Sequence, residues 1–319
     1  MTPGTVAAKR RSGIALAFVT ALVSGVAVYV NGFGVRAWRE IGVSTTVYTT
    51  AKNVVAALAL LGLASVAARR HQGRLSIRDV PRQARPWLIA IGLIGGAIAF
   101  VLFFEGLARA SSTQAALIHK SLFIWVAVLA VPLLGERMNG WHLGAFGLLV
   151  AGQVVIAGGL TDLSLGSGEM MILAATSLWS VEVVMAKHVL GTVSPLTVGV
   201  ARMGIGSLAL VAWVLVSGGL AGVSALSASH WGWIVLTGGT LTAYVATWYA
   251  ALTRAQAVDV TAVLVVGAVV TALLTFGIDG SGLPSLVGLG LLGAGAAAAA
   301  AAARAAGKRT GAPPSSVAA

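Results

Sequence analysis

The fold class of this chain is decided by residues 121–159, SLFIWVAVLAVPLLGERMNGWHLGAFGLLVAGQVVIAGG. They hold two apolar runs that are separated only by the polar segment GERMN. A helix needs about 20 predominantly apolar residues to cross a hydrocarbon core that is roughly 30 Å thick. The second run has that length, and the first reaches it by extending upstream. The stretch therefore predicts two neighbouring transmembrane helices.

The same alternation of apolar run and short connection continues along the 319 residues. In lipid, backbone polar groups must be satisfied within the membrane, which leaves only helices and closed β-barrels. The strands of a barrel would alternate in polarity over about 10 residues, and these runs do not. The sequence predicts an all-α membrane protein with ten transmembrane helices, at 12–33, 43–67, 87–108, 112–133, 140–160, 168–188, 195–217, 231–252, 258–277 and 284–303.

The composition indicates a lipid environment. Hydrophobic residues make up 58% of the chain and charged residues 9%, whereas an ordinary soluble domain has about 25% charged residues. The mean hydropathy is +0.93. Cysteine is absent, which excludes disulfides, thiolate metal sites and a cysteine nucleophile.

The net charge of +12 is distributed as in a membrane protein. Cytoplasmic flanks of membrane helices carry an excess of Lys and Arg, and one set of alternate connections holds 15 of the 21 such residues. The other set holds only Arg36, Arg39 and Arg109. We expect both termini in the cytoplasm, no nucleic-acid partner, and contact between the basic flanks and anionic lipid headgroups. The 15 residues are Lys9, Arg10, Arg11, Arg69, Arg70, Arg74, Arg78, Arg82, Arg85, Arg137, Lys187, Arg254, Arg304, Lys308 and Arg309.

Traces of internal repetition divide the chain into two halves of five helices. Two alignments between the halves match Arg109 to Arg254 and Lys52 to Arg202. Chance similarity among Ala-, Leu- and Gly-rich segments is the alternative explanation. The alignments pair 102–117 with 246–262, and 43–58 with 193–208.

An odd number of helices per half means that the second half enters the membrane with inverted orientation. Inverted repeats that place a substrate site near the midplane are a recurring design of transporters. We expect one repeat at 12–160, a more degenerate one at 168–303, and a disordered cytoplasmic tail at 304–319, whose composition is polar and contains proline.

Residues 103–159 are similar to a known family. The pair Gly135-Glu136 after an apolar helix, followed by a glycine-spaced helix, resembles the most recognisable signature of the EamA domain of the drug/metabolite transporter superfamily. The basic residue in the second helix of each half, Lys52 and Arg202, is similar to the family pattern as well. The resemblance extends over 12–303, more strongly in the first half than in the second.

The resemblance implies a ten-helix inner-membrane carrier that exports a small metabolite or drug-like compound by alternating access. It also implies that helices 1–4 and 6–9 line a central cavity, while helices 5 and 10 lie to the side. The chain departs from the family pattern in three places, which bear on the substrate rather than the fold. Asp279-Gly280 replaces a second Gly-Glu pair, Lys52 replaces an arginine, and His119-Lys120 replaces small polar residues and proline.

Ionisable residues inside the predicted spans are the first candidates for a substrate site. A charged side chain at the centre of a membrane helix costs about 2.5–3.5 kcal/mol, so it usually faces a cavity or a partner. Three cations against one carboxylate favour a cargo with an anionic group, such as a carboxylate or phosphate. Glu182 and His119 are candidates for proton coupling, because chains of such residues relay protons in transporters. The five residues are Lys52, His119, Lys120, Glu182 and Arg202.

Four of these residues also have a purely structural interpretation. The long side chains of Lys52 and Arg202 can reach the membrane interface while their stems stay in the apolar region. Glu182 and Arg202 are expected on adjacent helices at similar depth, where they would neutralise each other. His119 would then only bond to a neighbouring helix.

Aromatic residues inside the spans are the second group of candidates. Trp and Tyr usually occupy the membrane interfaces. However, Trp179 lies three residues from Glu182, so both side chains can face one cavity. Trp248 and Tyr249 follow the middle of their helix, where they would stack on a planar substrate.

Other features are expected to be structural. Glu105 and Arg109 are four residues apart and form a favourable helical pair. Glu136 is expected to make interfacial contacts with Arg137 or Lys187. The glycine-spaced helix that ends each half lets helix backbones approach closely, either within a monomer or in a homodimer.

The sequence lacks the signatures of a membrane-embedded enzyme. It has no H-E-x-x-H, aspartate-rich or Gly-x-Ser-x-Gly motif, and its nine acidic residues are scattered, which leaves too few ligands for metal chemistry. We expect no enzymatic activity, no cofactor and no metal. The leading hypothesis is a secondary transporter of a small molecule in the bacterial inner membrane. The alternative is a non-transporting membrane sensor or assembly protein.

Overall fold

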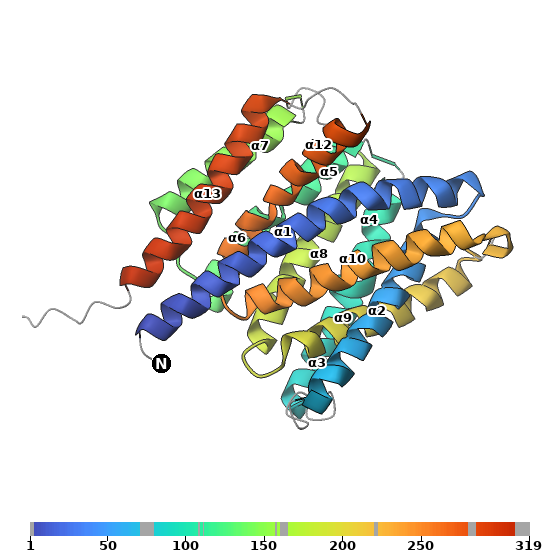
Figure 1. The fold of residues 1–319 in the computed structure, drawn as a ribbon, viewed down its shortest axis with the longest axis horizontal. Helices are drawn as coiled ribbons and strands as arrows, with labels where there is room; N and C mark the ends of the chain where they lie inside the picture. Colours follow the sequence, from blue (N-terminus) through green and yellow to red (C-terminus); the bar gives the residue numbers. More distant parts are fainter. Residues whose placement is uncertain are drawn as a thin grey trace, which may run out of the picture.

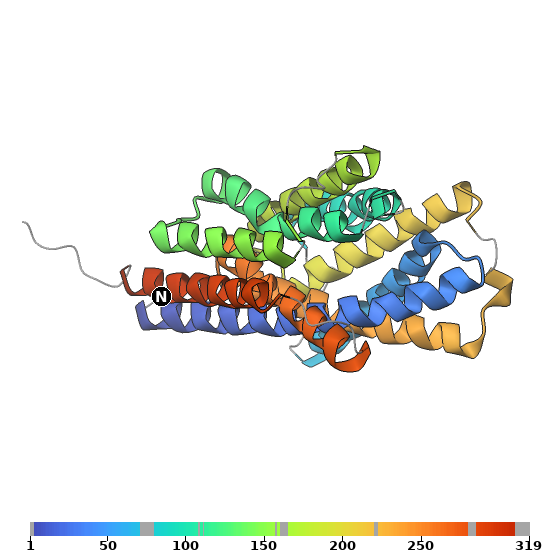
Figure 2. The same cartoon turned by 90° about the horizontal axis from the view of Figure 1, so that it is seen from above.

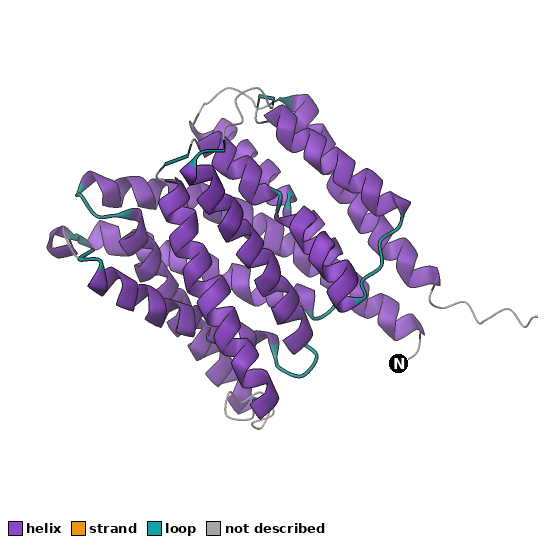
Figure 3. Cartoon of the chain, turned by 180° about the vertical axis from the view of Figure 1, so that it is seen from behind, coloured by secondary structure: helices purple, strands orange, loops and turns teal. Residues whose placement is uncertain are grey.

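The computed structural model describes residues 3–70, 80–107, 109–110, 112–156, 158–159, 165–219, 223–279 and 285–309. Within these ranges the chain forms a bundle of helices, and no strand occurs there (Figures 1 and 3). The elements are α1 (Pro3–Glu40), α2 (Thr45–Arg70), η2 (Arg82–Ala84), α3 (Arg85–Leu93), η3 (Ile94–Ile98), α4 (Ala99–Leu107), α5 (Ser112–Lys120), α6 (Leu122–Leu134), α7 (Gly140–Ile156), α8 (Ser167–Val189), α9 (Pro195–Val216), η4 (Val223–Ala225), α10 (Ala228–Leu252), α11 (Ala257–Leu264), α12 (Val266–Asp279) and α13 (Leu286–Arg309).

The ten expected stretches all fall on helices, but length and apolarity support fewer spans. Eight segments of the described residues are long and apolar enough to cross a membrane, and α7 is a shorter apolar helix. The 25-residue α10 is not among the eight, because threonine, tryptophan and tyrosine make its sequence less apolar. The expected number of ten spans is therefore not reached by these criteria.

Two boundaries differ from the sequence prediction. Helix α1 extends from Pro3 to Glu40, well beyond the apolar run at 12–33. Helix α13 continues to Arg309, so residues 304–309 are helical. The remaining tail, 310–319, lies outside the described residues.

Several spans are interrupted in the middle. The stretch expected at 87–108 contains the π-helical turn η3 between α3 and α4. The stretch at 112–133 breaks at Ser121, where the side-chain hydroxyl donates a 2.6 Å hydrogen bond to the carbonyl oxygen of Ile118. The stretch at 258–277 breaks at Val265, between α11 and α12. The fourth span of each half thus consists of two shorter helices.

Helices pack mainly across the two halves. The principal pairs are α1 with α10, α2 with α9, α4 with α8, and α7 with α13 (Figures 1 and 2). The first spans of the two halves are α1 and α8, and the third spans are α3–α4 and α10. Exchanging the halves therefore turns the α1–α10 pair into the α8–α4 pair. The α2–α9 and α7–α13 pairs become themselves. Helices α7 and α13 lie together along one flank of the bundle (Figure 1).

The start of α1 and the end of α13 lie at the same end of the bundle (Figure 2). We call this the terminal end. The end at which α1 finishes and α2 begins is the opposite end.

The interrupted helix α3–α4 packs against α9 through glycine. A Cβ atom added to Gly206 would lie 2.5 Å from the carbonyl oxygen of Gly96, and one added to Gly96 would lie 2.2 Å from the carbonyl oxygen of Arg202. Real Cβ atoms do not approach backbone that closely, so only glycine allows this contact. Gly204 lies on α9 as Gly206 does, but no atom would lie within 4 Å of a Cβ added to it.

These two glycines of α9 provide a matched test of the packing. We expect Gly206→Ala to destabilise the protein by about 1–3 kcal/mol, because the methyl group forces the two backbones apart. Gly204→Ala should be neutral or stabilising, since alanine is favoured over glycine in a helix interior by about 1 kcal/mol. Thermal unfolding in detergent measures both. Equal midpoints for the two variants would contradict the close contact.

Candidate functional site

A buried ion pair lies between the second-half helices α8, α9 and α10. The Oη atom of Tyr249 donates a 2.6 Å hydrogen bond to Glu182 Oε1, and Arg202 Nε lies 3.5 Å from Glu182 Oε2. The exposed fractions are 0% for Tyr249, 2% for Glu182 and 8% for Arg202. The guanidinium of Arg202 also lies over the ring of Phe100, 5.7 Å from its centroid. We call Glu182, Arg202 and Tyr249 the central cluster.

The π-helical turn η3 makes room for this cluster. A Cβ atom on Gly95 would lie 2.3 Å from Glu182 Cγ, so a larger residue there would displace the carboxylate. The indole Nε1 of Trp179 donates a 3.0 Å hydrogen bond to the carbonyl oxygen of Gly95. Glu182 and Trp179, which lie three residues apart on α8, therefore both pack on this turn, as their spacing predicts.

Aromatic rings extend the site along α4 and α5. The ring of His119 lies 5.0 Å from that of Trp179 and 5.1 Å from that of Phe103, measured between centroids. His119 Nδ1 is buried and has no hydrogen-bond partner among the described residues. On α10, Trp248 stacks on Tyr244 with 6.0 Å between centroids and 10° between planes. His119 and Trp179 thus join the aromatic surroundings of the central cluster, while Trp248 contacts its own helix.

Lys120 ends α5 next to the break at Ser121. Its side chain is half-buried, and no ion pair in the described part of the chain includes it.

Lys52 belongs to a separate polar group nearer the opposite end. Its Nζ donates a 2.8 Å hydrogen bond to Asn31 Oδ1 on α1 and lies 5.7 Å from the ring centroid of Tyr48. The hydroxyl of Tyr48 donates to Thr237 Oγ1 on α10 at 3.0 Å. Thr237 is 12 residues before Tyr249 on that helix, which corresponds to about 18 Å along its axis. The two aligned cations, Lys52 and Arg202, therefore occupy different depths.

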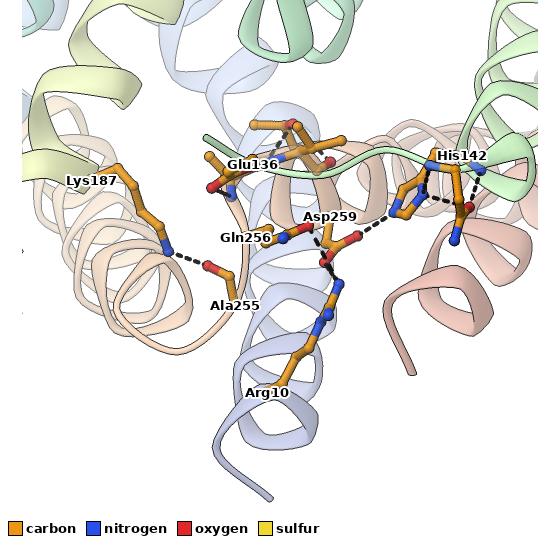
Figure 4. A network of polar contacts seen from close by, with 11 residues as sticks. Arg10, Glu136, His142, Lys187, Ala255, Gln256 and Asp259 are labelled. Carbon is orange, nitrogen blue, oxygen red and sulfur yellow. Dashed lines mark hydrogen bonds and ion pairs between the residues drawn. The ribbon is translucent and has the colours of Figure 1, made fainter. Parts of the chain in front are cut away.

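A second ionic network lies near the terminal end, and the sequence analysis did not predict it (Figure 4). Asp259, in the first turn of α11, is fully buried. It accepts a 2.8 Å hydrogen bond from Arg10 Nη2 on α1 and a 3.0 Å hydrogen bond from His142 Nε2 on α7. On its other side, His142 Nδ1 lies 3.1 Å from the backbone nitrogen of Asn139 and 2.8 Å from Asn139 Oδ1. The signal in the sequence was the single acidic residue of the apolar run AVDVTAVL.

Glu136 acts within this network as a helix cap. Its carboxylate accepts hydrogen bonds from the backbone N–H groups of Ala257, at 2.6 Å, and Val258, at 3.0 Å. These are first-turn N–H groups of α11, which lack partners inside the helix. The expected contact with Arg137 is not what positions Glu136. Burial raises the pKa of the Glu136 carboxyl, while the two N–H groups and the positive charge of Lys187 oppose that rise.

Lys187 ties α8 to the turn between α10 and α11. Its Nζ donates to the carbonyl oxygen of Leu252 and to that of Ala255 (Figure 4). The last carbonyl groups of a helix have no partner within it, so Lys187 satisfies the end of α10 while Glu136 satisfies the start of α11. Lys187 and Glu136 thus bind the two ends of the short connection between α10 and α11.

The remaining pair expected from the sequence is present at the surface. Arg109 Nη2 lies 3.1 Å from Glu105 Oε2, and both side chains are exposed. Among the described residues, no group of three His, Cys, Asp or Glu side chains is placed to hold a metal ion.

Comparison with known proteins identifies the family. The model of the EamA-like transporter family matches the chain twice, at residues 11–158 and 166–301. The chain belongs to this family. The EamA resemblance carried by Gly135-Glu136 is thereby confirmed, and with it a membrane protein of the drug/metabolite transporter superfamily.

Two further comparisons concern single proteins. No curated protein matches the chain. A solved structure described only as "Crystal structure of protein" is similar over 92% of this chain and 99% of that one, with a TM-score of 0.73 and 20% sequence identity. At that identity the likeness of this EamA-type chain to the solved structure shows a shared fold alone.

The cap formed by Glu136 yields a second prediction. Glu136→Ala leaves two buried N–H groups without acceptors, and an unsatisfied buried donor costs about 1–3 kcal/mol. We expect a clearly lower midpoint of thermal unfolding in detergent. Arg137→Ala, which changes an exposed neighbour, serves as the control and should leave the midpoint unchanged. A drop of the same size in both variants would refute the capping role.

Proposed function

We propose that this chain is a secondary transporter that moves a small metabolite or drug-like compound across the bacterial inner membrane by alternating access. It works as an exporter with both termini in the cytoplasm, and its two inverted repeats occupy 12–160 and 168–303. Membership of a transporter family supports the general activity. The direction follows the EamA pattern, and the orientation follows the distribution of Lys and Arg.

Three observations support the repeat. The family matches each half separately, the helix pairs map onto one another when the halves are exchanged, and the fourth span of each half is broken. The polar pairs agree as well: Asn31 and Lys52 are 21 residues apart and Glu182 and Arg202 are 20 apart. Each pair joins the first and second spans of its half.

The observation that carries the proposal is the central cluster. Glu182, Arg202 and Tyr249 lie on apolar helices, yet they are buried inside the protein rather than exposed to lipid. Ionisable residues in this position usually mark a substrate or ion pathway. A protein that only needed to span the membrane would be more stable with well-packed apolar residues, because a buried ion pair seldom repays its desolvation.

The terminal network supplies the closed side of the alternating cycle. The Arg10–Asp259 pair joins α1 to α11, and Lys187 holds the α10–α11 turn. Opening a path at the terminal end requires these helices to separate and these bonds to break. In the proposed cycle these bonds are intact whenever the cytoplasmic side is shut.

The charges favour an anionic cargo. Glu182 compensates Arg202, whereas the partner of Lys52 is the neutral amide of Asn31. Lys52 therefore keeps its full attraction for a carboxylate or phosphate. Lys120 adds a second cation, and Trp179, Trp248 and Tyr249 supply aromatic surfaces for a planar part of the cargo.

Transport itself is tested by flux into proteoliposomes, with a panel of labelled amino acids, nucleobases and organic anions. We expect at least one member to accumulate. Arg202→Gln, which leaves Glu182 buried without its partner, should reduce its flux at least tenfold, and so should Lys52→Met. Arg109→Gln removes an exposed arginine and is the matched control. If all three variants carried the wild-type flux, the interior cations would have no part in transport.

Proton coupling by Glu182 and His119 is tested with the same vesicles. A pH gradient should drive uphill movement of the cargo in the wild type. In Glu182→Gln the gradient should no longer drive transport, while exchange of labelled for unlabelled cargo continues, because the site remains but cannot release a proton. Glu105→Gln changes an exposed carboxylate and should behave as the wild type does. A gradient that still drives Glu182→Gln rules out this residue as the coupling group.

A further inference from the structure

Helices α2 and α9, which pack together, carry three buried side chains whose polar groups have no partner among the described residues. The side chain of Asn53 is fully buried, and both its amide oxygen and its amide nitrogen lack a hydrogen-bond partner among the described residues. Two hydroxyls also lack a hydrogen-bond partner among the described residues. They belong to Thr49, which is 1% exposed, and to Ser207, which is 5% exposed. Burying such a group without a partner costs about 1–3 kcal/mol. Burial of these three side chains therefore destabilises the fold, and no contact among the described residues compensates for it.

Other buried hydroxyls among the described residues do have hydrogen-bond partners. Thr50, Thr176 and Thr242 each donate a 2.8 Å hydrogen bond to the carbonyl oxygen four residues earlier. This is the usual way in which a helix satisfies a threonine or serine. Thr49 is adjacent to Thr50 on the same helix and does not use it. Within the described residues, the buried hydroxyls without a partner are therefore confined to α2 and α9.

Asn53 and Ser207 lie at one depth. Val47, near the start of α2, and Val214, near the end of α9, share one buried cluster, so the two packed helices run antiparallel. Asn53 is six residues after Val47, and Ser207 is seven residues before Val214. At 1.5 Å per residue, both are about 9–10 Å further into the bundle from the same level. They therefore lie at the same depth on two helices that pack together, and Thr49 lies one turn before Asn53 on the same face of α2.

This place lies between the two ionic groups already described. Lys52 precedes Asn53 in the chain and turns to Asn31 on α1. Arg202 lies five residues before Ser207 on α9, about 7 Å nearer the terminal end. A cargo that moves from one cation to the other has to pass the polar groups of Asn53 and Ser207.

We propose that Thr49, Asn53 and Ser207 form a substrate subsite for a group that presents a hydrogen-bond donor beside an acceptor, as a secondary amide does. The amide of Asn53 offers the complementary acceptor and donor, and the two hydroxyls supply further bonds. With the positive charge of Lys52 next to it, the subsite selects an anion that carries an amide. The inference deepens the proposed function, on which it rests only in taking the bound molecule to be the cargo.

Two small anions test this subsite. N-acetylglycine carries a carboxylate and a secondary amide, and levulinate is the same molecule with the amide N–H replaced by CH₂. Each is titrated at high millimolar concentration against the purified protein in detergent, and the rise in thermal unfolding midpoint gives the apparent affinity. We expect the wild type to bind N-acetylglycine about tenfold more tightly, the difference that one or two net hydrogen bonds provide.

The preference should disappear in Asn53→Leu, which keeps the size of the side chain and removes its polar atoms. It should weaken in Thr49→Val and in Ser207→Ala, which remain informative if the leucine variant does not fold. Thr50→Val, whose hydroxyl is satisfied within α2, is the matched control and should keep it. Without any ligand, Asn53→Leu should unfold at the wild-type temperature or above, because it removes an unsatisfied group.

Equal affinity of the wild type for both anions would overturn the proposal, and so would a preference that survives in all three subsite variants. A marked loss of stability in the ligand-free variants would also overturn it, since the polar groups would then serve the fold through bound water. Binding in detergent does not depend on flux. A protein that prefers N-acetylglycine but carries no cargo in vesicles contradicts the proposed transport alone, and flux without this preference contradicts the subsite alone.

Discussion

A polar group inside a membrane-embedded bundle has no water to bond with, so it must find its partner in the protein. This constraint organises the described structure. It sets Tyr249 and Arg202 against Glu182, and it places the carboxylate of Glu136 on the bare N–H groups of another helix. The Tyr249 and Glu136 contacts join segments that are not consecutive in the chain, while the Arg202 contact joins the neighbouring helices α8 and α9. The apolar residues determine that the helices lie in lipid, but the polar contacts determine which helices meet and at what height.

The same constraint separates two kinds of polar residue. The carboxylates of the terminal network have partners on other helices: Asp259 bonds to Arg10 and His142 in the described conformation. Asn53, at the centre, has no partner among the described residues. Fully satisfied networks make a region rigid and specific, whereas unsatisfied groups gain free energy from whatever binds to them. The satisfied terminal network therefore has the chemistry of a structural contact, whereas the unsatisfied groups at the centre are those on which the proposed subsite rests.

Features that depend on one segment could be predicted from the sequence, whereas contacts between distant segments were harder to predict. Helix positions follow from apolar runs, and Glu182 and Arg202 were evident because a charge stands out within an apolar window. The partners were harder: their pairing needed the depth and facing of two helices, although Glu182–Arg202 was one of the alternatives foreseen. Asn53 is uncharged and gave no signal, since its importance rests on the absence of a partner, which only packing can show. The capping role of Glu136 was invisible because the N–H groups that donate to it belong to the backbone of the other half.

The two halves are alike in packing but unequal in charge. The second half has carboxylates where the first half has amides. Where the second half has Glu182 paired with an arginine, the first half has Asn31, one residue from the corresponding place, paired with a lysine. Where the second half has Asp259, the aligned residue of the first half is Gln114. Amides thus replace carboxylates twice. A bundle of two equal halves would balance its two open forms, since exchanging the halves converts one into the other. If the chain works as the proposed carrier, the carboxylates of the second half are the groups that would make its two open forms unequal in stability.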